Sequence, residues 1–122
     1  MNVALWVGQI LLALICAVSG SLKSTQSLER MVETGQTAAK IVPLRYLRTA
    51  GVCELFAVLG LTLPWATGVA PVLTPVAATG FGLIMIMAAT VHSRLREPRN
   101  VATNAGILAV CVFVAVGRFA AL

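Results

Sequence analysis

Long apolar stretches alternate with shorter polar segments along the chain, and four of these stretches are long enough to cross a bilayer. About 20 helical residues, at 1.5 Å per residue, span the hydrocarbon core. The pattern predicts such spans at about residues 3–22, 43–63, 75–93 and 101–119. Backbone polar groups cannot stay unpaired in lipid, and the alternating pattern of barrel strands is absent, so each span is predicted to be a helix.

Proline and polar residues indicate where the helices begin and end. Pro43 suits the first position of the second span, and Pro64 is expected to end that span. Thr74 followed by Pro75 is the predicted cap and first residue of the third span. Asn100 is the predicted cap of the fourth.

The segment 23–42 is the only long connection between spans. Leu28, Met31 and Val32 fall on one side of a helical wheel, and Gly35 follows them as a stop signal. Two interpretations stay open for this segment. It forms either a short amphipathic helix on the cytoplasmic membrane surface or an ordered loop without a helix.

Composition narrows the class of protein. Of the 122 residues, 59% are hydrophobic and 11% are charged, whereas soluble domains carry about 25% charged residues. A chain of this size cannot cover a water-soluble fold with so few polar groups, so an ordinary soluble enzyme is excluded. We therefore expect an all-α polytopic membrane protein, a four-transmembrane-helix bundle in which residues 1–122 form a single membrane domain.

The placement of charge predicts the orientation in the membrane. Of the nine Lys and Arg residues, all except Arg118 lie in or beside the segment 23–42 or in the turn 94–100. Because basic loops stay in the cytoplasm, we expect a multi-pass plasma-membrane protein with both loops cytoplasmic and both termini outside. The basic loops lack the aromatic interleaving and modules of nucleic-acid-binding proteins, so the expected partner is the lipid bilayer and not nucleic acid.

Glu54 is the most informative polar residue, because it lies inside the second span, roughly 9–16 Å from the cytoplasmic end. An acidic residue near the bilayer centre is unfavourable by at least about 2.5–3.5 kcal/mol, so Glu54 needs a partner inside the bundle. Candidates from the same membrane half are Lys23, His92 and Asn104. Two roles stay open for Glu54: a protonatable or ligand-binding group in a cytoplasm-facing pocket, or the buried member of a polar clamp between helices.

A second set of polar candidates lies on the outer side. Arg118, near the outer end of the fourth span, either extends to the lipid headgroups or contacts Gln9, which lies deeper in the first span. Trp6 and Trp65 fall on the same outer face, where tryptophan commonly anchors helices at the interface.

Patterns for catalysis and metal binding are absent. With one His and no Asp, the chain offers no metal-ligand cluster. Phosphate loops, dinucleotide fingerprints and nucleophile elbows are missing as well. No cofactor site is evident from the residues, and we do not expect this chain to be an enzyme on its own.

Several short runs resemble those of DoxX-like membrane proteins, in the same order along the chain. They are SGSLK at 19–23, GVCEL at 51–55, LGLTLP at 59–64, LTPVAA at 73–78 and GRF at 117–119. The resemblance covers essentially the whole chain and implies a four-helix membrane bundle with family polar positions at Lys23, Glu54 and His92. The family name comes from a subunit of a thiosulfate–quinone oxidoreductase, so the resemblance associates the chain with quinone and with a redox protein partner.

Three functions are compatible with these observations, because a fold does not fix a function. The first is a non-catalytic or accessory membrane subunit that binds a small hydrophobic ligand, with quinone as the candidate, for a redox partner. The second is a small proton-coupled transporter of the multidrug type that uses Glu54. The third is a purely structural membrane scaffold. A homo-oligomer is compatible with each of them.

Overall fold

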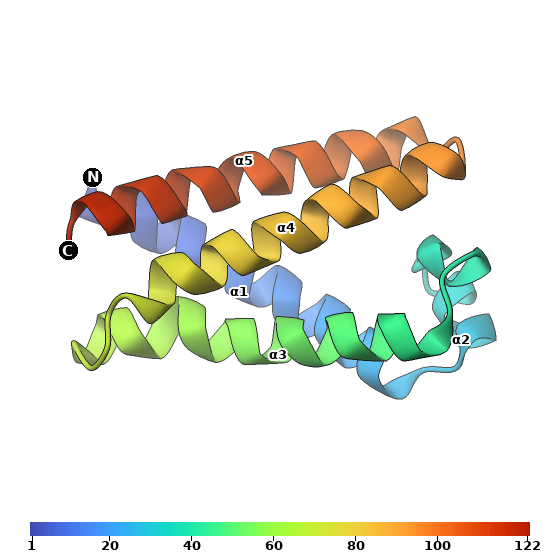
Figure 1. Cartoon of the computed structure of the whole chain (residues 1–122), viewed down its shortest axis with the longest axis horizontal. Helices are drawn as coiled ribbons and strands as arrows, with labels where there is room; N and C mark the ends of the chain where they lie inside the picture. Colours follow the sequence, from blue (N-terminus) through green and yellow to red (C-terminus); the bar gives the residue numbers. More distant parts are fainter.

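The structure, a computed structural model, describes all 122 residues, and every regular element in it is a helix (Figure 1). The elements are α1 (Asn2–Thr25), α2 (Leu28–Glu33), the 3₁₀ helix η1 (Thr37–Lys40), α3 (Leu44–Thr67), α4 (Leu73–Arg94) and α5 (Pro98–Ala120). By length and hydropathy, α1, α3, α4 and α5 can each cross a membrane. The predicted all-α fold with four membrane-spanning helices is confirmed.

The four long helices pack as two pairs. α1 lies along α3, α4 lies along α5, and contacts of α3 with α4 and of α1 with α5 join the pairs. Both chain termini and the α3–α4 turn lie at one end of the bundle, which we call the terminal end (Figure 1). α2, η1 and the α4–α5 turn lie at the other end, which we call the loop end.

A core of buried apolar side chains fills the space between the four long helices. Leu12 and Cys16 of α1 belong to the same cluster as Leu61 of α3, Phe81 of α4 and Val114 of α5. Many other large apolar side chains of these helices are exposed on the outside of the bundle. An apolar exterior of this extent is expected of a bundle surrounded by lipid.

α3 continues through Pro64 to Thr67, past the predicted end of the second span. Proline has no N–H, so the carbonyl oxygen of Gly60, four residues earlier, lacks its helical donor. Thr74 of α4 replaces that donor, because its hydroxyl donates to Gly60 O at 2.8 Å. Gly68, in the left-handed conformation with φ 74°, then ends the helix.

The starts of α4 and α5 also differ from the prediction. α4 begins at Leu73, and Thr74 is not its cap because the hydroxyl is used on α3. α5 begins at Pro98 with Glu97 as the preceding residue, so Asn100 lies in its first turn. Proline suits this first position because the N–H that it lacks has no partner there in any helix.

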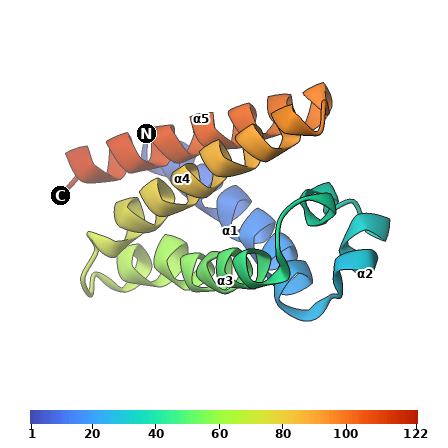
Figure 2. The ribbon, with the colours of Figure 1, turned by 45° about the vertical axis from the view of Figure 1, so that its right-hand side comes forward.

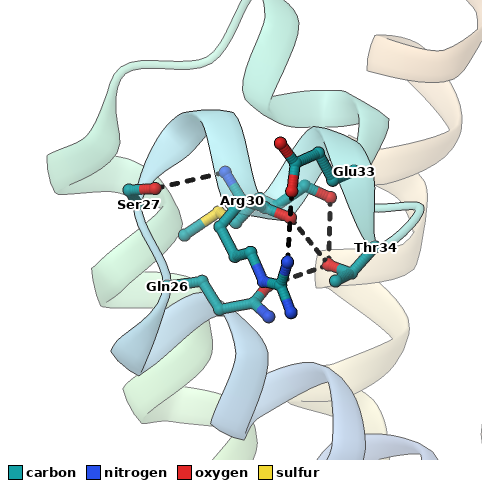
Figure 3. Close-up of polar contacts among 6 residues, drawn as sticks. Gln26, Ser27, Arg30, Glu33 and Thr34 are labelled. Carbon is teal, nitrogen blue, oxygen red and sulfur yellow. Dashed lines mark hydrogen bonds and ion pairs between the residues drawn. The ribbon is translucent and has the colours of Figure 1, made fainter.

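The connection between α1 and α3 contains a short helix, α2, so the interpretation of this segment as an ordered loop without a helix is wrong. Ser27 caps α2, since its hydroxyl accepts a hydrogen bond from Arg30 N at 3.1 Å (Figure 3). Thr34 donates to the side-chain oxygen of Gln26 at 2.9 Å, which joins the two ends of the short helix. Gly35, with φ 95°, follows the end of α2.

The apolar side of α2 packs against protein. Met31 is fully buried in a small cluster with Ala39 of η1 and Leu47 of α3, so the segment folds back on the loop end of the bundle (Figure 2). The opposite side of α2 carries an exposed ion pair between Arg30 and Glu33 at 3.2 Å (Figure 3). The apolar residues that suggest a membrane-surface helix therefore serve to close the loop end.

Candidate functional site

Lys23 and Glu54 form a buried ion pair between α1 and α3. Nζ of Lys23 donates to Oε1 of Glu54 at 2.9 Å, and the two residues are 8% and 0% exposed. The other carboxylate oxygen of Glu54 is buried and has no hydrogen-bond donor. Arg48 donates to the carbonyl oxygen of Lys23 at 2.8 Å, which ties the same part of α1 to α3. Among the three candidate partners of Glu54, Lys23 is the one in contact.

α1 and α3 cross closely beside this ion pair because each helix carries a glycine there. A Cβ atom at Gly20 would lie 2.8 Å from the carbonyl oxygen of Gly51, and one at Gly51 would lie 2.7 Å from Cβ of Lys23. Small residues commonly allow such close backbone approach between membrane helices. The crossing keeps Lys23 against α3, and the pair is thereby suited to fixing the register of the two helices.

His92, in the last turn of α4, belongs to a different polar cluster at the loop end. Its Nδ1 donates to Oε1 of Glu97 at 2.8 Å, and the hydroxyl of Thr37 donates to the same oxygen at 2.8 Å. Asn100 Nδ2 adds a donor at 3.3 Å. The hydrogen bond from His92, followed by that from Thr37, stabilises the carboxylate and lowers the pKa of Glu97 below its ordinary value. His92 is therefore a partner of Glu97 and not of Glu54.

Asn104 lines a cleft between α4 and α5. The residue is 7% exposed, and its amide nitrogen is buried without an acceptor. The cleft has a volume of about 600 Å³, and six of its ten lining residues are hydrophobic. Its other polar lining residues are Thr90, Ser93 and Arg94. An apolar cleft with a few polar groups on its wall is the usual form of a site for a small organic molecule.

A second cleft, of about 760 Å³, lies between α3 and α4 and is almost wholly apolar, with 12 hydrophobic residues among the 15 that line it. It offers an acyl chain a surface but offers a polar headgroup little to bind. Neither cleft has Glu54 or Lys23 in its lining. The ion pair is thus separate from both clefts.

Arg118 is buried at the terminal end, with 2% exposure, and does not extend outward to the surface. Its Nε donates to Oε1 of Gln9 at 2.6 Å, and its Nη1 donates to Oδ1 of Asn2 at 2.9 Å. Gln9 donates from Nε2 to the carbonyl oxygen of Leu61 at 2.8 Å, which extends the network from α5 through α1 to α3. Of the two alternatives for Arg118, the structure has the contact with Gln9.

Comparison with known families adds to this geometry. A family model described as the DoxX-like family matches residues 7–114, which is most of the chain. The chain belongs to the DoxX-like family. No curated protein and no solved structure matches this DoxX-like protein.

The polar cluster around His92 in the DoxX-like protein contains two residues that the sequence analysis missed, Thr37 and Glu97. Glu97 could have been found, because it is one of only four acidic residues and follows the single histidine by five positions. Thr37 carries no comparable signal, since its approach to Glu97 depends on how the segment between α1 and α3 folds back.

The structure offers no obvious metal site. No group of three His, Cys, Asp or Glu side chains lies close enough together to hold a metal ion, and the three cysteines, Cys16, Cys53 and Cys111, are all free. The buried polar groups that retain unused hydrogen-bonding capacity outside the ion pair include the amide of Asn104 and the guanidinium of Arg118. These two groups lie on opposite halves of α5.

From the hydrogen bonds of Glu97 we expect the loop end of the DoxX-like protein to become less stable in acid. Because folding lowers the pKa of Glu97, its contribution to stability is present above the unfolded pKa of about 4.3 and is lost as pH falls through the folded value. We expect Glu97→Gln to reduce hydrogen-exchange protection of residues 37–40 severalfold at pH 7. Glu29→Gln, which removes the same charge from an exposed position, should leave it unchanged. Equal protection in the two variants would contradict the role given to Glu97.

Proposed function

We propose that this DoxX-like protein is a non-catalytic membrane subunit that binds a small hydrophobic ligand, with quinone as the candidate, in the α4–α5 cleft for a redox protein partner. The observation that carries the proposal is the amide of Asn104, which is buried in the cleft wall without an acceptor. Buried polar groups in folded proteins are nearly always hydrogen-bonded, and Asn104 is one of the residues that line the cleft, so we take its unpaired amide nitrogen as the candidate donor to a ligand there.

The chemistry of the cleft suits a quinone headgroup. The two carbonyl oxygens of a quinone are acceptors, and the amide of Asn104 and the guanidinium of Arg94 supply N–H donors. The apolar lining of the same cleft, which includes Met85 and Leu108, suits the hydrophobic remainder of the molecule. A quinone supplies the two-electron chemistry when bound. The chain's own part is to bind and orient the headgroup.

The proposed ligand site lies away from Glu54, for which the sequence leaves a ligand-binding role open. Glu54 already has Lys23 as its counter-ion and lines neither cleft. A proton-coupled transporter would need this carboxylate to exchange protons with water or substrate during each cycle. Because Glu54 is already paired with Lys23, a structural role, in which the pair holds α1 and α3 together, is favoured over proton transport.

The test is a quinone titration of the purified protein, with wild type beside Asn104→Leu. Loss of one hydrogen bond to a ligand carbonyl is expected to weaken binding about tenfold. Leu has the same number of side-chain heavy atoms and the same branching as Asn, and it removes an unpaired buried amide, so Asn104→Leu should unfold no more easily than wild type. This combination of unchanged stability with weaker binding distinguishes a ligand contact from a structural residue.

Glu54→Gln serves as the comparison in the same titration. We expect it to bind quinone as wild type does in whatever fraction remains folded. Quinone binding that is lost in Glu54→Gln and kept in Asn104→Leu would contradict the assignment of the cleft. Absence of saturable binding in wild type would remove quinone as the ligand.

We also propose that the protein lies in the plasma membrane with its loop end in the cytoplasm. The support is the concentration of Lys and Arg at that end, with Arg118 as the only one at the other. In intact cells, an impermeant maleimide should label Thr67→Cys at the terminal end and not Thr34→Cys in the loop-end segment, with wild type as the background for the native cysteines. The reverse labelling would contradict this orientation.

A further inference from the structure

Arg118 is a buried cation without a counter-ion. The three ion pairs of the chain involve other residues. The four acidic residues all lie away from the terminal end: two in α2, one at the α4–α5 turn, and Glu54 in the middle of α3, 13 residues before that helix ends at Thr67. A charge buried in a membrane protein is costly unless an opposite charge or a full set of polar partners compensates it.

The polar partners of Arg118 inside the protein are incomplete. A guanidinium has five N–H donors, and here Nε donates to Gln9 while Nη1 donates to Asn2. Nη2 is buried and donates to no protein atom. Both acceptors are neutral amide oxygens, so the site holds a full positive charge and two unused N–H donors on one nitrogen.

Two tryptophans lie against the same guanidinium. Its central carbon is 4.4 Å from the ring centroid of Trp65 and 5.7 Å from that of Trp6, in the range of cation–π contacts. Both indoles are only half-buried, and Asn2 is exposed. The groups around Arg118 thus include three side chains that reach the surface. Access of an anion to the buried Nη2 requires these side chains to rotate.

We propose that Arg118, with Trp6 and Trp65 around it, binds an anionic oxygen group, a phosphate or a carboxylate, at the terminal end of the bundle. A guanidinium presents its N–H groups in the fork that matches two oxygens of such a group. The indole N–H groups add donors of the same kind, and tryptophan favours the depth at which lipid phosphates lie. The anion comes either from a lipid headgroup or from a free solute, and the site lies at the opposite end of the bundle from the polar groups of the Asn104 cleft.

Trp6 and Trp65 make the proposal directly measurable, because they are the only two tryptophans in the chain. Protein in a non-ionic detergent is titrated, and the tryptophan emission is recorded. One arm uses dioctanoyl phosphatidylglycerol in mixed micelles, the second uses inorganic phosphate against chloride of equal ionic strength, and the third uses dioctanoylglycerol, which has the same tails without the anion.

We expect a saturable change in emission with phosphatidylglycerol and none with dioctanoylglycerol. Saturation with phosphatidylglycerol alone identifies a lipid headgroup as the source, whereas saturation with inorganic phosphate as well identifies a free anion. Arg118→Lys keeps the positive charge but lacks the planar guanidinium that donates to two oxygens at once. The concentration of phosphatidylglycerol that gives half-saturation should therefore rise about tenfold. Arg99→Gln, which removes one arginine from the loop end, should titrate as wild type does.

The proposal would be overturned by no saturation with either anion, by the same response to dioctanoylglycerol, or by wild-type titration of Arg118→Gln. An equal loss of response in Arg99→Gln would also overturn it, because it would mean a general effect of net charge. If Arg118→Gln fails to fold, Arg118→Lys and the three wild-type arms still decide between these outcomes.

Discussion

Lys23→Met is expected to destabilise the folded bundle by about 3 kcal/mol, because it leaves the fully buried Glu54 without its counter-ion. Glu54→Gln should have a smaller effect, about 1–2 kcal/mol. Lys23 lies near the end of α1 and can extend its amine toward water when the carboxylate is gone. The double variant should be more stable than Lys23→Met alone, since it removes both charges together.

The measurement is the free energy of unfolding of all four proteins in a denaturing-detergent titration. A coupling energy of about 1–3 kcal/mol between the two sites is expected of a buried, contacting pair. Exposed Arg30 and Glu33 provide the matched control, because their ion pair should give a coupling of less than about 1 kcal/mol. Additive effects of the Lys23 and Glu54 substitutions would contradict the interpretation of the pair as a clamp.

Gly51→Ala should destabilise the protein by about 2 kcal/mol. The added methyl would lie 2.7 Å from Cβ of Lys23 and 3.0 Å from the carbonyl oxygen of Gly20, and the second of these is backbone that cannot rotate away. α1 and α3 must therefore separate, which also weakens the hydrogen bond from Lys23 to Glu54. Thermal unfolding followed by circular dichroism measures the effect.

Gly80→Ala is the control for this substitution. It makes the same chemical change in a membrane helix, but nothing lies within 4 Å of the new methyl group. We expect it to be neutral or slightly stabilising, because alanine favours helix more than glycine does. If Gly51→Ala were as stable as Gly80→Ala, the close crossing of α1 and α3 would not contribute to stability.

The helical fold could be predicted from hydropathy, whereas the helix ends could not. The length and apolar character of the four spans follow from the bilayer that they must cross. Pro64 is a sound stop signal when considered locally, and it fails here because Thr74, ten residues later, donates to the carbonyl oxygen that the proline leaves without a donor. A tertiary hydrogen bond of this kind has no local signature.

The polar contacts were predictable only in part, for a related reason. Burial cost alone indicates that Glu54 and Arg118 need partners inside the bundle, and Lys23 and Gln9 are among those proposed. Which candidate makes contact depends on how the helices are rotated and shifted. That arrangement brings His92 to Glu97 at the loop end and leaves the amide of Asn104 in a cleft.

Photolabelling shows most directly whether a quinone-sized ligand binds beside Asn104, as we propose, or beside Glu54. The protein is irradiated with an azidoquinone, with and without excess unlabelled quinone, and the labelled peptides are identified by mass spectrometry. We expect the competed label to fall within residues 85–108, on the facing parts of α4 and α5. Competed label within residues 20–24 and 51–58, on either side of the Lys23–Glu54 pair, would contradict it.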